Sequence, residues 1–582
     1  MKLARATIPG LPALRSDILA GLVVGIIAFP LSIALAVAVG VPPVWGLYTA
    51  VFAGAVAAAF GGSRYNITGP TAALVPVLSH AVLTHGPEAL PLLAFMSGLL
   101  LLAFSYFRAG RLVRYIPGTV VVGFTAGIAL SLAFGQLNNL LEVRGIDGSK
   151  EHFHERLLDT LSHLDTVGWR TPALGFLMVG LLVAWPRLPR LRAIPGPLAA
   201  VALGTVLSSF AGFDAATVKD NYGSIPREFP RPTLSWFELG LAVELLPLAF
   251  SVAILAGIES LLSAVVADGM APAGPRHDSD RELRGQGLGS IAAALFGGIP
   301  STAAIARTAA GIRSGGRSRA TGVSHSIVVL AATLLFGGLA GSIPMTVLAA
   351  ILLIVAWNIA EVPEVYRLVV RAPRGDAAVV LATAGITLFF DLTYAIAFGV
   401  LASMAMLLRQ MSRIPAAQEL LPDESGRIRR VTPELSELMK SRPDIAFFNA
   451  EGLLSFYSAA TFEYELSDRT RNPLILRMKD VFHIDATGLL TLEGIIEHRQ
   501  HHGGRIILTA IQPELRPVLE KFGIIEKLGP ENVFEHTRCA IESIDRPDGR
   551  LPHPDTSELE VDAVRPQPSE ALPPLRTGNA EG

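Results

Sequence analysis

Long apolar runs fill the first two thirds of the chain. Residues 18–63 contain no Asp, Glu, Lys or Arg over 46 positions. Further uninterrupted runs of the same kind cover 89–107, 115–141, 285–306, 320–360 and 392–408. A membrane-spanning helix needs about 20 apolar residues, so the first run has room for two spans and predicts a retained first helix. The pattern predicts a polytopic helical membrane protein with roughly a dozen or more helices.

From about residue 443 the long apolar runs are replaced by short ones, and the hydrophobic period changes. These predict strands at 445–449, 453–457, 474–478 and 505–509, and helices at 459–466, 487–502 and 513–521. Strands that alternate with helices indicate a small α/β domain with a mixed sheet. The segment beyond 546 is rich in Pro, Asp, Glu and Ser, and we expect it to be disordered because it cannot bury a core.

Composition supports this division. Hydrophobic residues make up 51% of the chain and charged residues only 17%, against about 25% in an ordinary soluble protein. Of the 98 charged residues, 48 lie in 413–582. We therefore expect five parts, with arginine clusters placing the tail on the cytoplasmic side. They are an N-terminal cytoplasmic segment (1–16), a transmembrane domain (17–412), a linker (413–435), an α/β domain (436–546) and a disordered tail (547–582).

Charge and motifs exclude several classes of protein. A net charge of −2 excludes the basic footprint of a nucleic-acid binder. The single cysteine, Cys539, excludes a disulfide framework and any multi-cysteine metal site. No Gly-Lys pair occurs, so a P-loop for ATP is missing and transport must use gradients. No nucleophile–base–metal constellation points to an enzyme, and we expect no cofactor beyond a coupling ion.

Two similar segments lie 231 residues apart, at 70–74 and 301–305, and each begins a span with Pro, Gly or a hydroxyl residue. Such interrupted segments at corresponding places are typical of inverted-repeat transporters, whose half-helices meet at the bilayer midplane. Two facing helix N-termini offer unpaired N–H groups and partial positive charge, which suits an anion. The alternative is a chance match within alanine-rich sequence.

Two ionisable residues accompany the repeat. Glu259 is the only charged residue in 245–267, and an intramembrane carboxylate indicates a functional site. Arg307 follows the second repeat motif, about a turn and a half into a half-helix expected to begin at Ser301, and would add positive field to the anion pocket. The competing interpretations are an ion pair between Glu259 and Arg307, or an arginine at the membrane edge.

Several motifs carry a family resemblance. They are Ala28-Phe29-Pro30-Leu31-Ser32-Ile33-Ala34, Gly46-Leu47-Tyr48, Gly69-Pro70-Thr71-Ala72-Ala73 and Ala303-Ala304-Ile305-Ala306-Arg307. On these motifs the chain resembles the sulfate permease (SulP) family of anion transporters. The resemblance implies about fourteen segments in two inverted repeats, a core moving against a gate, a cytoplasmic STAS domain and a homodimer.

The resemblance also implies site residues. Glu259 matches an acidic position linked to the coupling cation, and Ser263 matches a hydroxyl position that helps to bind sodium in some relatives. The expected coupling ion is a proton, with sodium as the alternative, because the acid here is Glu. The substrate-binding residues expected from the half-helices are Thr71, Ala72, Thr302, Ala303, Ala304, Ala306 and Arg307.

The motif Gly257-Ile258-Glu259-Ser260-Leu261-Leu262 is similar to the branch that carries C4-dicarboxylates, so proton-coupled uptake of succinate-like anions is the expected function. Inorganic anions such as sulfate or bicarbonate are the alternative. Leu31 replaces the Gln found after this proline in many relatives, so their substrates do not transfer directly to this chain. A nucleobase permease and an anion-responsive protein without transport are more remote. The setting expected is a bacterial inner membrane, with lipid around the helices.

The tail departs from the STAS pattern in Asp485-Ala486-Thr487-Gly488, because alanine replaces the serine that is phosphorylated in anti-sigma-factor antagonists. Phosphorylation at position 486 is therefore excluded. Asp485 or Thr487 is expected to cap a helix, and modification of Thr487 is the alternative. A cytoplasmic partner on this domain is also expected.

Overall fold

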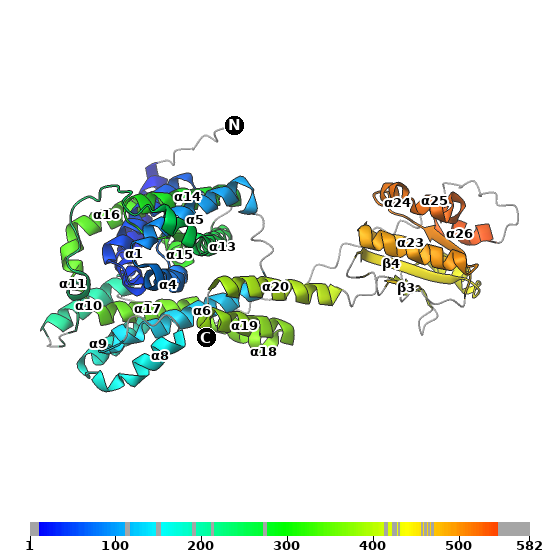
Figure 1. Ribbon diagram of the computed structural model, residues 1–582. Coiled ribbons are helices and arrows are strands. Elements are labelled where there is room, and N and C mark those ends of the chain that lie inside the picture. The colour runs from blue at the N-terminus through cyan, green and yellow to red at the C-terminus, as the bar shows by residue number, and fades with distance from the viewer. Residues whose placement is uncertain are drawn as a thin grey trace. The chain divides into compact units, whose positions relative to one another are not determined.

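The computed structural model describes residues 11–110, 117–146, 153–188, 194–210, 213, 215–271, 276–390, 392–411, 417–421, 428, 431–455, 458, 462, 463, 466 and 471–544. The chain forms two compact units, Met1–Ser403 and Met404–Gly582 (Figure 1). Each unit is described by itself below.

The first unit is almost entirely helical. Its helices are α1 (Leu11–Val39), α2 (Pro43–Tyr48), η1 (Thr49–Ala53), α3 (Gly54–Phe60), η2 (Ala72–Leu74), α4 (Val75–His85), α5 (Ala89–Tyr106), α6 (Gly118–Gly135), α7 (Leu137–Leu141), α8 (Phe153–Ser162), η4 (Leu164–Thr166), α9 (Arg170–Ala184), η5 (Trp185–Arg187), α10 (Gly196–Phe210), α11 (Val218–Tyr222), α12 (Leu239–Glu244), α13 (Leu246–Met270), α14 (Ser279–Leu295), α15 (Ile305–Arg313), α16 (Ala320–Ala340), α17 (Met345–Ile359), α18 (Val362–Arg371), α19 (Arg374–Phe389) and α20 (Leu392–Met411), which runs past the unit boundary.

Among the residues that the structure describes, seven helical stretches are long and apolar enough to cross a membrane. They are Pro12–Val39, Pro43–Phe60, Ala89–Tyr106, Gly118–Leu141, Leu246–Met270, Ala320–Ala340 and Met345–Arg371. Two shorter apolar stretches, Ala72–His85 and Gly196–Phe210, accompany them. Two of the long stretches cover most of the run 18–63, as predicted, and the first of them extends beyond it because α1 begins at Leu11.

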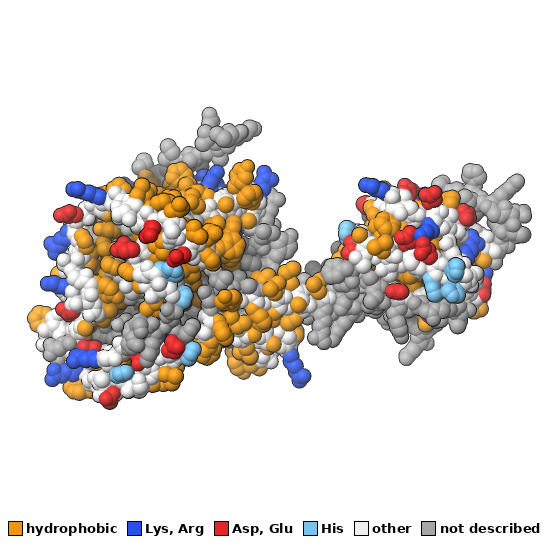
Figure 2. All heavy atoms as spheres, in the orientation of Figure 1, with side chains coloured by type: hydrophobic (Ala, Val, Ile, Leu, Met, Phe, Trp, Pro, Cys, Tyr) orange, Lys and Arg blue, Asp and Glu red, His pale blue; other side chains and the backbone are white. Residues whose placement is uncertain are grey.

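The outer surface of this unit is apolar. Figure 2 shows hydrophobic side chains over most of its visible face. Phe176, Leu335 and Leu339 are each more than half exposed, which would be unfavourable in water. A bilayer removes that cost, because its hydrocarbon core is as apolar as these side chains. The prediction of a helical membrane body is thereby confirmed.

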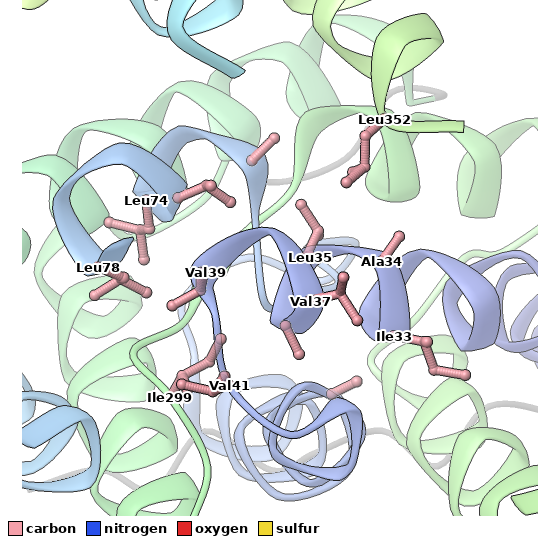
Figure 3. Close-up of a cluster of buried hydrophobic side chains, with 14 of the residues drawn as sticks. Ile33, Ala34, Leu35, Val37, Val39, Val41, Leu74, Leu78, Ile299 and Leu352 are labelled. Atoms are coloured by element: carbon pink, nitrogen blue, oxygen red, sulfur yellow. The ribbon is translucent and has the colours of Figure 1, made fainter. Parts of the chain in front are cut away.

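The helices form two groups within the unit (Figure 1). One group, called the core group here, holds α1, α3, α4, α5, α13, α14, α15 and α16. The other, called the gate group, holds α6, α9, α10, α17, α18 and α19. Helix α1 packs against α16 of the core group and also against α17 of the gate group. Figure 3 shows this second contact, where Leu352 of α17 points toward Ala34 and Leu35 of α1 within one buried hydrophobic cluster.

The second unit is an α/β domain around a five-stranded mixed sheet of order β3-β4-β5-β6-β7. Strand β3 pairs antiparallel to β4, whereas the other neighbours pair in parallel. The strands are β3 (Ala417–Glu419), β4 (Ala446–Leu454), β5 (Leu474–Ile484), β6 (Ile506–Thr509) and β7 (Val533–Phe534). The helices are α21 (Pro433–Lys440), α23 (Ala486–His501), α24 (Arg516–Phe522), α25 (Ile524–Leu528), η7 (Pro530–Asn532) and α26 (Thr537–Ile544).

Apolar residues on both faces of the sheet are buried. Along β5, Leu474, Leu476 and Met478 join one hydrophobic cluster, while Ile475 joins a second cluster. This assignment follows from the two-residue period of a strand, which points successive side chains to opposite faces. The predicted mixed α/β domain is confirmed.

Two boundaries in this domain differ from the prediction. Residues 445–449 and 453–457 do not form separate strands; β4 is one strand over Ala446–Leu454. Its pairing with β5 shifts register near Gly452, whose φ is +77°, so the glycine marks a bulge rather than a turn. Most of the predicted helix at 459–466 and the predicted disordered tail lie outside the described residues.

The start of α23 also confirms a prediction. Asp485 is the N-cap, and its side chain accepts a hydrogen bond of 2.8 Å from the Gly488 N–H. Thr487 lies inside the first turn and is not the cap. Capping by the aspartate satisfies one of the N–H groups that every helix start leaves unpaired.

We expect deletion of residues 436–582 to leave anion binding intact, because both repeat segments lie within the first unit. Equilibrium binding of radiolabelled sulfate to the purified full-length and truncated proteins would measure this, and equal dissociation constants are expected. A truncated protein that keeps its membrane-domain melting transition but no longer binds would contradict the prediction.

Candidate anion and coupling-ion site

The two repeat segments meet inside the core group. Strand β1 (Thr68–Gly69) pairs antiparallel with β2 (Thr302–Ala303), so that Thr68 faces Ala303 and Gly69 faces Thr302. Helical turns η2 and α4 follow β1, and α15 follows β2. The sequence repeat therefore marks two short strands that pair with each other, each followed by a short helix.

The second helix begins later than predicted. Helix α15 starts at Ile305 rather than Ser301, and Arg307 lies in its first turn. The physical reason is the strand pairing, which holds Thr302 and Ala303 in extended conformation. In the first repeat, Thr71 is extended and Ala72 begins the helical turn.

The pairing also changes which N–H groups an anion could use. The Ala303 N–H donates to the Ser260 hydroxyl at 3.0 Å, and the Ala304 N–H donates to the Ile67 carbonyl at 3.0 Å. The prediction that Ala303 and Ala304 offer their N–H groups to substrate is therefore wrong. A helix start leaves its first N–H groups without intrahelical partners, so Ala306 remains a candidate, and its side chain is exposed.

Glu259 joins the two repeats. Its Oε2 accepts hydrogen bonds from the hydroxyls of Thr71 at 3.0 Å and Thr302 at 2.7 Å. Glu259 itself is half-buried on α13. The structure brings these three predicted site residues together, but the threonine hydroxyls donate to the carboxylate. Each hydroxyl has one proton, so neither can donate to an anion at the same time.

Arg307 also reaches across the repeats. It is buried, with 3% of its surface exposed, and its Nη2 donates to the Pro70 carbonyl of the first repeat. Its Nε and Nη1 are buried without a hydrogen-bond partner among the described residues. Buried donors of this kind point to a ligand or to water.

Glu259 and Arg307 do not form a direct ion pair in the part of the chain that the structure describes, although their charges interact. Glu259 is bound by Thr71 and Thr302, and Arg307 is bound by Pro70. Arg307 is also buried rather than exposed at the surface of the unit. These contacts place both charged groups at the crossing of the two repeat segments.

A buried carboxylate that the sequence analysis missed lies below the crossing. Glu282 on α14 is 1% exposed and accepts four hydrogen bonds. Its Oε2 accepts from the Gly62 and Ser63 N–H groups, each at 2.8 Å. Its Oε1 accepts from Asn66 Nδ2 at 2.7 Å and Gln286 Nε2 at 2.9 Å. Four N–H donors compensate the loss of hydration, so this charge anchors α14 to the segment that leads into β1.

Ser263 belongs to the same network. Its hydroxyl is fully buried and lies within hydrogen-bonding distance of Asn66 Oδ1 at 3.0 Å and Thr308 Oγ1 at 3.1 Å. The Ile67 N–H also donates to Thr308 Oγ1, at 3.1 Å. Ser263 thus connects α13, the segment before β1 and α15, whereas Glu259 contacts the two threonines. The sequence contained one signal for this network, a stripe of polar residues on α14 at a spacing of four, namely Glu282, Gln286 and Ser290.

This architecture matches that of known protein families. The model of the sulfate permease family matches residues 14–383, and the model of the STAS domain matches residues 438–540. The chain belongs to the sulfate permease family. The protein is therefore an integral membrane anion transporter of that family with a C-terminal STAS domain.

Relatives of this sulfate permease family member cover nearly its full length. It is 36% identical over 526 residues to YvdB of Bacillus subtilis (strain 168), provisionally named a sulfate transporter, covering 90% of this chain and 96% of that protein. It is 29% identical over 545 residues to the bicarbonate transporter BicA of Picosynechococcus sp., covering 91% and 94%. Both relatives are named as transporters.

Solved structures support the same fold. The overall structure of SLC26A9 matches with a TM-score of 0.78 at 19% identity, covering 91% of this chain and 90% of that chain. The transmembrane domain of a cyanobacterium bicarbonate transporter BicA matches with a TM-score of 0.59 at 27% identity, covering 67% and 97%. The helical transporter fold and the attached STAS domain expected from the resemblance are confirmed.

We expect Arg307→Ala to weaken anion binding by up to about 30-fold, because a charge near helix termini contributes about 0.3–2 kcal/mol and 1.4 kcal/mol is a factor of ten. The apparent KM of anion uptake measures this. Arg313→Ala is the matched control, since Arg313 ends the same helix and is exposed. An unchanged KM for every transported anion in Arg307→Ala would reject the role.

We expect Glu282→Ala to destabilise the membrane domain by at least about 3 kcal/mol, because four buried N–H donors lose their acceptor. The melting temperature of the purified protein in detergent would show the loss. Glu238→Ala, an exposed acidic residue at the start of α12, is the control and should melt like the wild type. Equal melting temperatures for both variants would contradict an anchoring role.

Proposed function

We propose that this protein is a secondary active transporter that carries a small inorganic oxyanion, of the sulfate type, together with a proton. One observation carries the proposal: at the β1–β2 crossing, Glu259 accepts from one threonine of each repeat segment and Arg307 donates to the first repeat segment from the second, and the two charged groups do not pair with each other. An ionisable carboxylate and a fixed cation then lie beside the start of α15. This arrangement suits an anion site whose affinity depends on the charge of the carboxylate.

The substrate class is argued from the relatives. YvdB is named for sulfate and BicA for bicarbonate, and both align with more than nine tenths of their own length. Their names favour inorganic anions over the C4-dicarboxylates expected from the motif around Glu259. Bicarbonate is the second candidate, because BicA also matches in structure over the transmembrane domain.

Coupling follows from the hydrogen bonds of Glu259. While the carboxylate is charged, it holds the hydroxyl protons of Thr71 and Thr302. A protonated Glu259 no longer needs two donors, so the hydroxyls can turn to an anion, and the repulsion between the anion and the carboxylate ends. Proton and anion would therefore favour each other's binding reciprocally.

The charge of Arg307 opposes this step, since it stabilises the charged carboxylate. Proton coupling requires that burial of Glu259 and repulsion by the bound anion exceed this attraction. The lack of a direct ion pair between the two side chains supports that balance. Sodium is the alternative coupling ion. The Ser263 hydroxyl expected to bind it lies beside the Asn66 Oδ1 and Thr308 Oγ1 atoms.

The setting is also part of the proposal. We place the protein in the inner membrane of a bacterial cell with the STAS domain in the cytoplasm, where it can bind a regulatory partner. A homodimer is the proposed assembly, as the family resemblance implies. A nucleobase permease is disfavoured because a cation, Arg307, occupies the second half-helix.

Uptake into proteoliposomes tests the proposal. Radiolabelled sulfate, bicarbonate and succinate would each be offered with an inward proton gradient, with an inward sodium gradient and with neither. We expect sulfate uptake to rise as external pH falls and to be driven by the proton gradient. Accumulation driven by sodium alone would reject proton coupling, succinate as the preferred substrate would reject the substrate class, and bound anion without flux would reject transport.

Glu259→Gln separates binding from coupling. Glutamine resembles the protonated acid, so we expect the variant to bind sulfate at least as tightly as the wild type but to lose accumulation on a proton gradient. Equilibrium binding and gradient-driven uptake, measured on the same preparation, give the two readouts. A variant that still concentrates sulfate on a proton gradient would refute the role of Glu259.

A further inference from the structure

The Arg307 side chain lies directly over Gly69. The guanidinium leaves the first turn of α15, passes the β1 strand and donates from Nη2 to the Pro70 carbonyl. A Cβ atom built on Gly69 would collide with Nη1 of this guanidinium. The next neighbours of that Cβ, the Cα and Cβ of Ala50, would lie at 3.4 and 3.5 Å, which are ordinary contacts.

The backbone at Gly69 does not itself need glycine. Gly69 is absent from the described glycines with positive φ and forms part of an antiparallel strand, a conformation that alanine adopts readily. The requirement at this position is therefore only for space, and the group that occupies the space is the Arg307 guanidinium.

We propose that Gly69 is a positioning residue for Arg307: by lacking a side chain it lets the guanidinium of the second repeat dock on the Pro70 carbonyl of the first repeat. Docking uses Nη2 and leaves Nε and Nη1, both buried and unpartnered, as the donors available to an anion or its water. The inference rests on the proposed function, because it assigns Gly69 to the same anion site.

The effect of a methyl group at Gly69 depends on which neighbouring group can move away from it. Ala50 makes only ordinary contacts, whereas Nη1 is the far end of a flexible side chain. The cheapest relief in Gly69→Ala is a shift of the guanidinium away from Pro70. An added methyl group at Gly69 would not replace any atom of the strand pairing or of the hydrogen bonds of Glu259, so the fold should persist while the position of the charge changes.

The test compares Gly69→Ala, Arg307→Ala and the double variant in sulfate uptake. We expect Gly69→Ala to raise the apparent KM by up to about 30-fold, the same limit as for Arg307→Ala. Because Gly69 acts only through Arg307, the double variant should have the KM of Arg307→Ala alone, and the two factors should not multiply. Multiplying factors, or an unchanged KM in a folded Gly69→Ala protein, would overturn the proposal.

Gly257→Ala is the matched control. It adds a methyl group in the same core group, two residues from Glu259, where the new Cβ would meet the Cδ2 atoms of Leu283 at 3.3 Å and Leu101 at 3.5 Å. A methyl group there does not reach Arg307, so we expect the KM to remain near that of the wild type. A KM rise in Gly257→Ala equal to that in Gly69→Ala would overturn the specific link to Arg307.

Melting temperatures keep the inference separate from the proposed function. Gly69→Ala should lower the melting temperature in the wild-type background but not beside Arg307→Ala, where the collision is gone. Arg307→Gln would replace Arg307→Ala if the alanine variant does not fold. If Arg307→Ala leaves the KM unchanged, the proposed anion site fails. The steric link between Gly69 and Arg307 is then tested by the melting temperatures alone. If Gly69→Ala lowers the melting temperature equally in the wild-type and Arg307→Ala backgrounds, the link is overturned.

Discussion

The antiparallel pairing of β1 with β2 is the contact on which the rest of the membrane domain depends. Within a bilayer, backbone N–H and C=O groups outside a helix must find partners inside the protein, since each unpaired group costs several kcal/mol. Thr68–Gly69 and Thr302–Ala303 satisfy each other, and Ala304 donates to Ile67 just beside them. The pairing thereby permits two helical segments, η2 and α15, to begin inside the unit directly after the two strands.

Side chains then bind the crossing together from both directions. Glu259 on α13 accepts from one threonine of each repeat, and Arg307 of the second repeat donates to Pro70 of the first. Beneath them, Glu282 holds the segment before β1 through four N–H donors. Glu259 and Arg307 form their hydrogen bonds with neutral partners rather than with each other. A change in the charge of Glu259 therefore acts first on the hydrogen bonds from the threonine hydroxyls.

The sequence was sufficient to predict the membrane body, the α/β domain and the meeting of the two repeat segments. Glu259 was found because a charge within an apolar run is rare, and Arg307 because it directly follows the second repeat motif. The start of α15 was misplaced because Thr302 and Ala303 pair with residues more than 200 positions away, which no local pattern records. Asn66 and Ser263 could not be assigned from their residue types, since an asparagine or serine acquires its role only from the partners that the fold brings to it.

The seam between α1 and α17 differs in kind from the crossing. Leu352 meets Ala34 and Leu35 there through aliphatic surface alone, as Figure 3 shows, and dispersion contacts of this kind have no preferred direction. Sliding one helix group past the other would exchange such contacts for similar ones, whereas separating the half-helices would break hydrogen bonds and expose charge. A change in the relative position of the two helix groups would therefore cost less at this seam than at the crossing.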